Sequence, residues 1–168
     1  MIVPLEQAFG WSRDQISLAV SVNILLYGLT APFAAALMER FTVRKVVMTA
    51  LFAVGVGSFL TLFMTRPWHL VLLWGVVVGV GTGSMALVFA ATVANRWFVE
   101  KRGLVVGALT AAAATGQLIF LPVISTLAVN NGWKSVSLTI GLAAIAVIPL
   151  IWLGLKESPQ SVGLKPYG

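Results

Sequence analysis

The stretch GVVVGVGTG, from Gly75 to Gly83, lies inside an uncharged apolar run and carries glycines at a helical spacing. Gly75, Gly79 and Gly83 are four residues apart, which places them on one face of a helix. A glycine-rich nucleotide-binding loop follows a strand and opens a helix, whereas this stretch has apolar residues on both sides. The spacing is typical of close helix–helix contact in a membrane. Gly103 and Gly107 repeat it later in the chain.

Long apolar segments account for most of the 168-residue chain. Hydrophobic residues make up 59% of the sequence and charged residues only 10%, whereas soluble domains carry about 25% charged residues. A helix of about 20 apolar residues crosses a bilayer, and transmembrane strands are shorter and alternate in polarity. The sequence therefore predicts an all-α membrane protein with five transmembrane helices, at about 15–38, 46–65, 69–94, 103–128 and 134–155.

Lys and Arg residues are distributed unevenly between the two sides of these predicted helices. One side holds eight of them: Arg40, Arg44, Lys45, Arg96, Lys101, Arg102, Lys156 and Lys165. The other side holds three: Arg13, Arg66 and Lys134. Because loops rich in Lys and Arg stay in the cytoplasm, we expect residues 1–14 outside, a five-helix bundle over 15–155 and a cytoplasmic segment over 156–168. We expect an integral protein of the bacterial inner (plasma) membrane.

Ionisable side chains are absent from the interior of the predicted helices, and the chain has one histidine and no cysteine. Intramembrane proton relays, zinc sites and Ser-His-Asp arrangements all need such side chains. The sequence therefore predicts no enzyme activity, no metal site and no cofactor. The net charge of +6 follows from the basic loops, so we expect no nucleic-acid partner.

Neutral polar side chains remain within the predicted helices, and those of the first and fourth helices include the candidates for a polar pathway. Asn23 and Tyr27 lie one turn apart in the first helix, and Thr115 and Gln117 lie about halfway along the fourth. Such side chains either hydrogen-bond to a neighbouring helix or line an aqueous pathway, and Thr can also bond to its own helix. We take these four residues as candidates for contact with a substrate.

The loop MERFTVRKVV, residues 38–47, concentrates its four charges in seven residues. Together with the preceding alanines it resembles the signature between the second and third helices of the major facilitator superfamily. That signature reads Gly, three residues, Asp-Arg, one residue, Gly, one residue and two basic residues. The corresponding positions here are Ala35, Glu39, Arg40, Thr42, Arg44 and Lys45. The charge pattern is kept, whereas both glycines and the aspartate are replaced.

Three later segments resemble monocarboxylate/oxalate-porter-like members of the same family. NRWFVEKRGLVVGALTAAAATGQ (95–117) is similar to their connection between the fourth and fifth helices, NNGWK (130–134) to the loop before the sixth, and KESPQSVGLKPYG (156–168) to the start of the central loop. The resemblance implies that the five predicted helices are helices two to six of a twelve-helix transporter. The first helix and the C-terminal half would then lie outside this chain.

The resemblance also implies a function, namely secondary active transport of a small solute, a small organic anion, by alternating access. It implies a conformational latch formed by Ala35, Glu39, Arg40, Arg44 and Lys45, which holds a helix of the C-terminal half in the outward-facing state. Many proton-coupled drug exporters of the family carry an arginine four residues before a glycine of the fourth helix. Gly75 stands at that position, four residues before Gly79, which speaks against proton antiport by their scheme.

The implied partners are the lipid bilayer, a small-molecule substrate, and the missing first helix and C-terminal half of the transporter. Two alternatives remain open at this point. One is a stand-alone five-helix membrane protein with an assembly or regulatory role and no transport activity. The other is a half-size transporter that works as a dimer.

Overall fold

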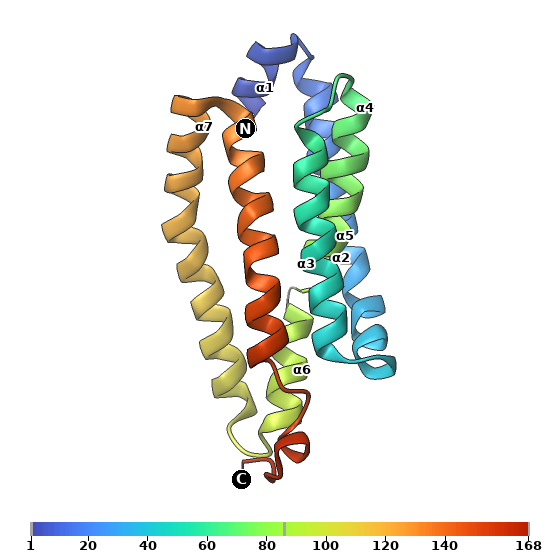
Figure 1. Cartoon of the computed structure of the whole chain (residues 1–168), viewed down its shortest axis with the longest axis vertical. Coiled ribbons are helices and arrows are strands. Elements are labelled where there is room, and N and C mark those ends of the chain that lie inside the picture. The colour runs from blue at the N-terminus through green and yellow to red at the C-terminus, as the bar shows by residue number, and fades with distance from the viewer. Residues whose placement is uncertain (1, 86, 168) are drawn as a thin grey trace.

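The computed structural model describes residues 2–85 and 87–167, which form a bundle of long helices (Figure 1). In chain order the elements are α1 (Ile2–Phe9), α2 (Arg13–Arg40), α3 (Val43–Thr61), α4 (Pro67–Leu70), η1 (Val71–Val78), α5 (Gly79–Gly83), α6 (Leu87–Trp97), α7 (Arg102–Gly154) and η2 (Pro159–Val162). Parts of the predicted segments 1–14, 69–94 and 156–168, at residues 1, 86 and 168, lie outside the described residues. The predicted all-α membrane fold is confirmed.

The two-residue connection between α2 and α3 explains why the charges of this region are so concentrated. α2 begins after Ser12, whose hydroxyl accepts a hydrogen bond from the Gln15 N–H at 3.4 Å. α3 begins after Thr42, whose hydroxyl accepts from the Lys45 N–H at 3.2 Å. Because such caps satisfy backbone N–H groups at helix starts, α3 begins directly after the turn. The charged residues therefore lie on helix ends, not on a long loop.

The third predicted helix is built from several helical pieces. α4 begins at Pro67, η1 is a π-helix, and α5 and α6 continue the path toward Trp97. A π-helix has a wider turn than an α-helix and often occurs at functional sites. Gly75 of η1 and Gly79, the first residue of α5, both lie against the backbone of α2.

α7 contains both of the last two predicted helices. Gly132 has φ 77° and ψ 174°, an extended conformation with positive φ that breaks the helix and that glycine adopts without steric cost. Figure 1 shows the result, in which a first arm (102–131) and a second arm (133–154) run antiparallel. The described residues thus contain four helical stretches long and apolar enough to cross a membrane, and the last of them holds two of the five expected spans.

The two arms of α7 differ in their surroundings. The second arm packs against α3 and contains the buried residues Trp133, Val136 and Gly141. The first arm is largely exposed, and Leu104 and Leu118 have 71% and 77% of their surface accessible. The core of the bundle therefore lies among α2, α3, η1, α5 and the second arm.

Candidate functional site

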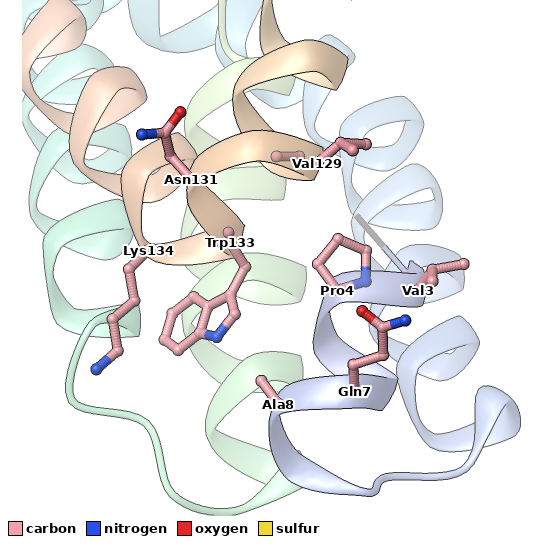
Figure 2. A pocket seen from close by; sticks show the side chains of 10 residues that line it. Val3, Pro4, Gln7, Ala8, Val129, Asn131, Trp133 and Lys134 are labelled. Carbon is pink, nitrogen blue, oxygen red and sulfur yellow. The ribbon is translucent and has the colours of Figure 1, made fainter.

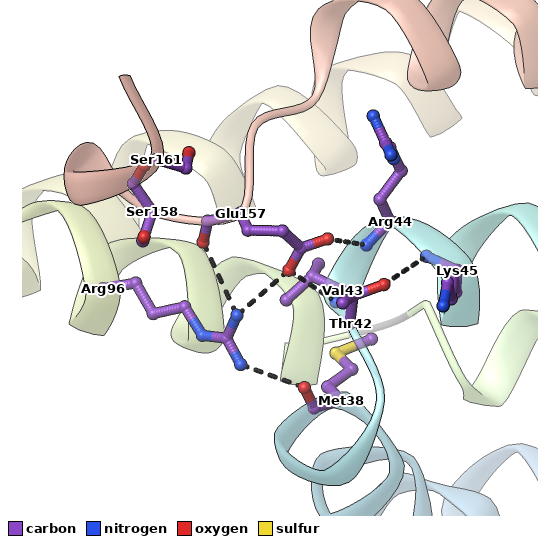
Figure 3. A network of polar contacts seen from close by, with 9 residues as sticks. All are labelled: Met38, Thr42, Val43, Arg44, Lys45, Arg96, Glu157, Ser158 and Ser161. Atoms are coloured by element: carbon purple, nitrogen blue, oxygen red, sulfur yellow. Dashed lines mark hydrogen bonds and ion pairs between the residues drawn. The ribbon is translucent and has the colours of Figure 1, made fainter. Parts of the chain in front are cut away.

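A network of polar contacts joins three segments at one end of the bundle, residues 38–45, 95–102 and 155–167. We call this end the charged end. Figure 3 shows the network between the end of α2, the start of α3, the end of α6 and the tail that follows α7. Two residues form its centre, Arg96 of α6 and Glu157 of the tail. Each of them acts on the end of another helix.

Glu157 stabilises the N-terminus of α3. One carboxylate oxygen accepts a hydrogen bond from the Val43 N–H at 3.0 Å, and the other accepts from the Arg44 N–H at 2.9 Å. The first N–H groups of a helix have no partner within the helix, and a negative charge there is favoured by the helix dipole. Glu157 therefore caps α3 from a segment more than 110 residues away in the chain.

Arg96 performs the corresponding role at the C-terminus of α2. Its Nη2 donates to the Met38 carbonyl at 2.9 Å, and its Nη1 donates to the Glu157 carboxylate at 3.2 Å. The Arg96 and Glu157 side chains are only 28% and 27% exposed, so water screens the pair less than a surface ion pair. One guanidinium thus links the end of α2 to the group that caps α3.

This arrangement can work as a fastening. Hydrogen bonds to charged groups contribute about 1.5–3 kcal/mol each, and those here run between separate elements. The end of α2 is held by the Arg96 bond to Met38, and the start of α3 is held by the Glu157 bonds to Val43 and Arg44. The network therefore fastens the ends of separate elements to one another without using hydrogen bonds from inside either helix.

Four of the five predicted latch residues lie at the charged end, and they contribute to the network unequally. Arg44 takes part through its backbone, and its guanidinium donates to the Trp152 carbonyl at 3.3 Å. Glu39, Arg40 and Lys45 are exposed, and Ala35 is half-buried. The acidic group that meets the α2–α3 connection is Glu157, which the sequence analysis did not single out. Its position directly after an apolar segment, in KESP, was the available signal.

The substrate-pathway candidates lie on two elements. Asn23 and Tyr27 are on α2, where the Asn23 amide donates to the Trp74 carbonyl at 2.7 Å and Tyr27 is 44% exposed. Thr115 and Gln117 are on the first arm of α7 and exposed, and the Thr115 hydroxyl donates to the Ala111 carbonyl of its own helix. Their contact with a substrate stays a prediction.

The predicted packing glycines fall into two groups. Methyl groups added at Gly75, Gly79 and Gly83 would lie 3.2, 3.0 and 2.6 Å from carbonyl oxygens of α2. Methyl groups at Gly103 and Gly107 would meet nothing within 4 Å. The first group therefore lies directly against a neighbouring helix, whereas the second lies on an open face.

The opposite end of the molecule contains a pocket of about 550 Å³ between α1 and the bend of α7. Figure 2 shows Gln7, Asn131 and Lys134 around it, with the Trp133 ring between the two elements. Among its described lining residues, no side-chain hydrogen bond or ion pair joins α1 to α7. Nearby, Arg13 of α2 donates to Glu6 of α1, and the Ser135 hydroxyl donates to the Asn131 carbonyl of its own helix. In residues 2–85 and 87–167, no three His, Asp or Glu residues gather as metal ligands. The charged end is therefore the better candidate.

Comparison with known proteins gives the family. The family model of the Major Facilitator Superfamily matches residues 1–167. The uncharacterized MFS-type transporter YcxA of Bacillus subtilis is 31% identical over 95% of this chain and 40% of its own length. Human monocarboxylate transporter 7 is 28% identical over 86% of the chain and 27% of its own length.

A third relative is the membrane sensor protein UhpC of Salmonella typhimurium, 29% identical over 94% of the chain and 35% of its own length. The chain thus spans at most 40% of the length of these relatives. The match nevertheless covers nearly all of the chain itself, from α1 to the tail that carries Glu157. By its sequence and its helical bundle, the chain belongs to the Major Facilitator Superfamily.

Proposed function

We propose that this chain forms part of a secondary transporter that moves a small solute across a membrane by alternating access. The observation that carries the proposal is the Arg96–Glu157 network, which fastens the ends of α2 and α3 to the tail. Alternating access requires helix bundles that move largely as rigid bodies around a central site. In this proposal the network keeps the ends of α2, α3 and α6 and the tail together, so that this bundle moves as one body.

The orientation that we propose places the charged end in the cytoplasm. Eight of the Lys and Arg residues lie on that side of the predicted helices, against three on the other, and positive loops favour the cytoplasmic side. In a bacterial inner membrane, α1 would then lie outside. The exposed first arm of α7 would pack against the first helix of the transporter, and the C-terminal half would complete the substrate cavity.

The substrate class that we propose is a small organic anion. Support comes from the names of two relatives, monocarboxylate transporters 7 and 13. The neutral residues Asn23, Tyr27, Thr115 and Gln117 stay our candidates for contact with the substrate. The interiors of the predicted helices carry no basic residue to neutralise a carboxylate. A cationic partner for the substrate would therefore come from the other half of the transporter.

The test uses the complete transporter, meaning this chain together with the first helix and the C-terminal half that the proposal assigns to it, reconstituted into liposomes with a panel of labelled short-chain carboxylates. We expect uptake of at least one carboxylate and no uptake of a labelled neutral sugar. Glu157→Gln should slow the uptake, while the exposed Glu100→Gln serves as the matched control. Absence of uptake for every carboxylate would contradict the substrate class.

A sensor without transport activity is the second candidate, because one relative is named a membrane sensor protein. A sensor binds its ligand and changes conformation without releasing it on the other side. Saturable carboxylate binding without accumulation inside the liposomes would favour this role. Accumulation of a labelled carboxylate inside the liposomes, without accumulation of the labelled neutral sugar, would favour the transporter.

A further inference from the structure

An apolar groove of about 470 Å³ runs between α2, α3 and α5 and opens near the charged end. Its α3 wall carries Lys45, Thr49 and Ala53, which are spaced one turn apart and share one face. Val80 and Gly81 of α5 form the opposite wall. Because eight residues of a helix extend about 12 Å, the groove continues well beyond Lys45 along α3.

The floor of the groove is formed by a close approach of α5 to α3. A methyl group added at Gly81 would lie 2.7 Å from a Val54 methyl carbon and 3.0 Å from the Ala50 carbonyl oxygen. The lining beyond Lys45 is mostly apolar, with Thr49 and Ser84 as its hydroxyl groups. The Ser84 hydroxyl donates to the Val80 carbonyl of its own helix, so it leaves the apolar character of the groove intact.

The mouth of the groove is cationic. Lys45 is exposed, and within the described part of the chain no carboxylate lies in ion-pair distance of its ammonium group. Arg40 is also exposed, and its guanidinium carbon lies 5.8 Å from the ring centre of Phe41, another lining residue. Residues 39–45 hold three cations and one anion, Glu39. The guanidinium of the third cation, Arg44, donates to the Trp152 carbonyl.

The groove combines a cationic mouth with an apolar interior. Two of the helices that form it, α2 and α3, are long and apolar enough to cross a membrane. A lipid of the surrounding bilayer presents the same two features, a charged headgroup and a hydrocarbon chain. A symmetric second copy fits less well, because a twofold interface through this groove would place Lys45 near its own equivalent, and like charges oppose association.

We propose that this groove binds an anionic phospholipid, with the phosphate between Lys45 and Arg40 and one acyl chain along Thr49 and Ala53. Basic groups between transmembrane helices recognise anionic headgroups in this way. The binding depends on the charge and shape of the groove and is independent of any transport activity. It gives the α2–α3 connection a ligand in addition to its contact with the tail.

The experiment measures lipid binding to the purified full chain by native mass spectrometry, with phosphatidylglycerol and phosphatidylcholine of identical acyl chains. Phosphatidylglycerol is expected to bind more tightly. Lys45→Gln should weaken its binding about fivefold, the effect of one basic residue near an anionic surface, and leave phosphatidylcholine unchanged. Lys134→Gln, the same change at the opposite end, is the control and should have no effect.

A second pair of variants tests the groove itself. Thr49→Phe fills the groove and should weaken the binding of both lipids, whereas Thr139→Phe on an exposed face of α7 should not. Equal binding of the two lipids by the unmodified chain would overturn the proposal, as would equal effects of Lys45→Gln and Lys134→Gln. Loss of a dimer in Thr49→Phe with unchanged lipid binding would assign the groove to a second copy instead.

Discussion

Two helical faces of this molecule carry the same glycine spacing in opposite surroundings. On η1 and α5, a methyl group added at Gly83 would lie 2.6 Å from the Tyr27 carbonyl oxygen and 2.9 Å from the Tyr27 Cα atom. On the first arm of α7, a methyl group added at Gly107 would meet no atom within 4 Å. The spacing alone therefore does not determine whether a glycine face is packed.

The difference lies in the partner helix. The α2 residues nearest to Gly75, Gly79 and Gly83 are Ala19, Asn23 and Tyr27, which are also four residues apart. Two faces with the same period can stay in register along their length, and small residues allow their backbones to approach. The first arm of α7 has no such neighbour among the described residues, and its face is available to another helix.

Of the glycine and asparagine substitutions on these faces, Gly83→Ala is expected to change the free energy of unfolding most. The new methyl group would meet backbone atoms of α2, which cannot rotate away, so α2 has to shift. We expect the free energy of unfolding to fall by about 1–3 kcal/mol, as in overpacked cores. The measurement is reversible unfolding in mixed detergent micelles, followed by circular dichroism. A Gly83→Ala variant as stable as the unmodified chain would show that this face is not tightly packed.

Gly107→Ala tests the exposed glycine face on the first arm of α7. Gly107 lies in a helix with open space around it, and glycine within a helix is about 0.8–1.0 kcal/mol less favourable than alanine. We therefore expect a higher free energy of unfolding for the isolated chain, in the same detergent assay. A clear destabilisation would mean that a neighbour already covers this face.

Asn23→Ala gives the smallest expected effect on the packed face. The change removes the hydrogen bond from the Asn23 amide to the Trp74 carbonyl. Interhelical hydrogen bonds in membrane proteins contribute about 0.6 kcal/mol on average, so we expect a loss of that order. Ser21→Ala, at an exposed position of the same helix, is the control. Equal stability of the two variants would show that the Asn23–Trp74 hydrogen bond does not stabilise the α2 interface.

The sequence was sufficient to predict the helices because apolar length and charged boundaries are local properties. The predicted range 15–38 lies within α2, and the break predicted at 130–134 contains Gly132. The sequence therefore placed the turn between the two arms of α7, although it did not show that the positive φ of the single residue Gly132 makes this turn.

The centre of the candidate site was missed for a different reason. Glu157 caps Val43 and Arg44 across more than 110 residues, and no local pattern specifies such a pairing. The sequence indicated a charged connection at 38–47 but drew attention to Glu39, which is exposed in the structure. Long-range polar contacts follow from the packing of the helices, and the packing depends on partner faces such as that of α2.

The most direct test of the account asks whether the Arg96–Glu157 network fastens the start of α3. Val43 is 2% exposed, and its N–H donates to Glu157. Because the chain contains no cysteine, the Val43→Cys substitution introduces a single thiol at this position. The rate of maleimide labelling then reports how often the charged end opens. Loss of about 1.5 kcal/mol of charged hydrogen bonding in Glu157→Gln predicts labelling about tenfold faster, with no change for Glu100→Gln. Equal labelling rates in the Glu157→Gln and unmodified backgrounds would contradict the account.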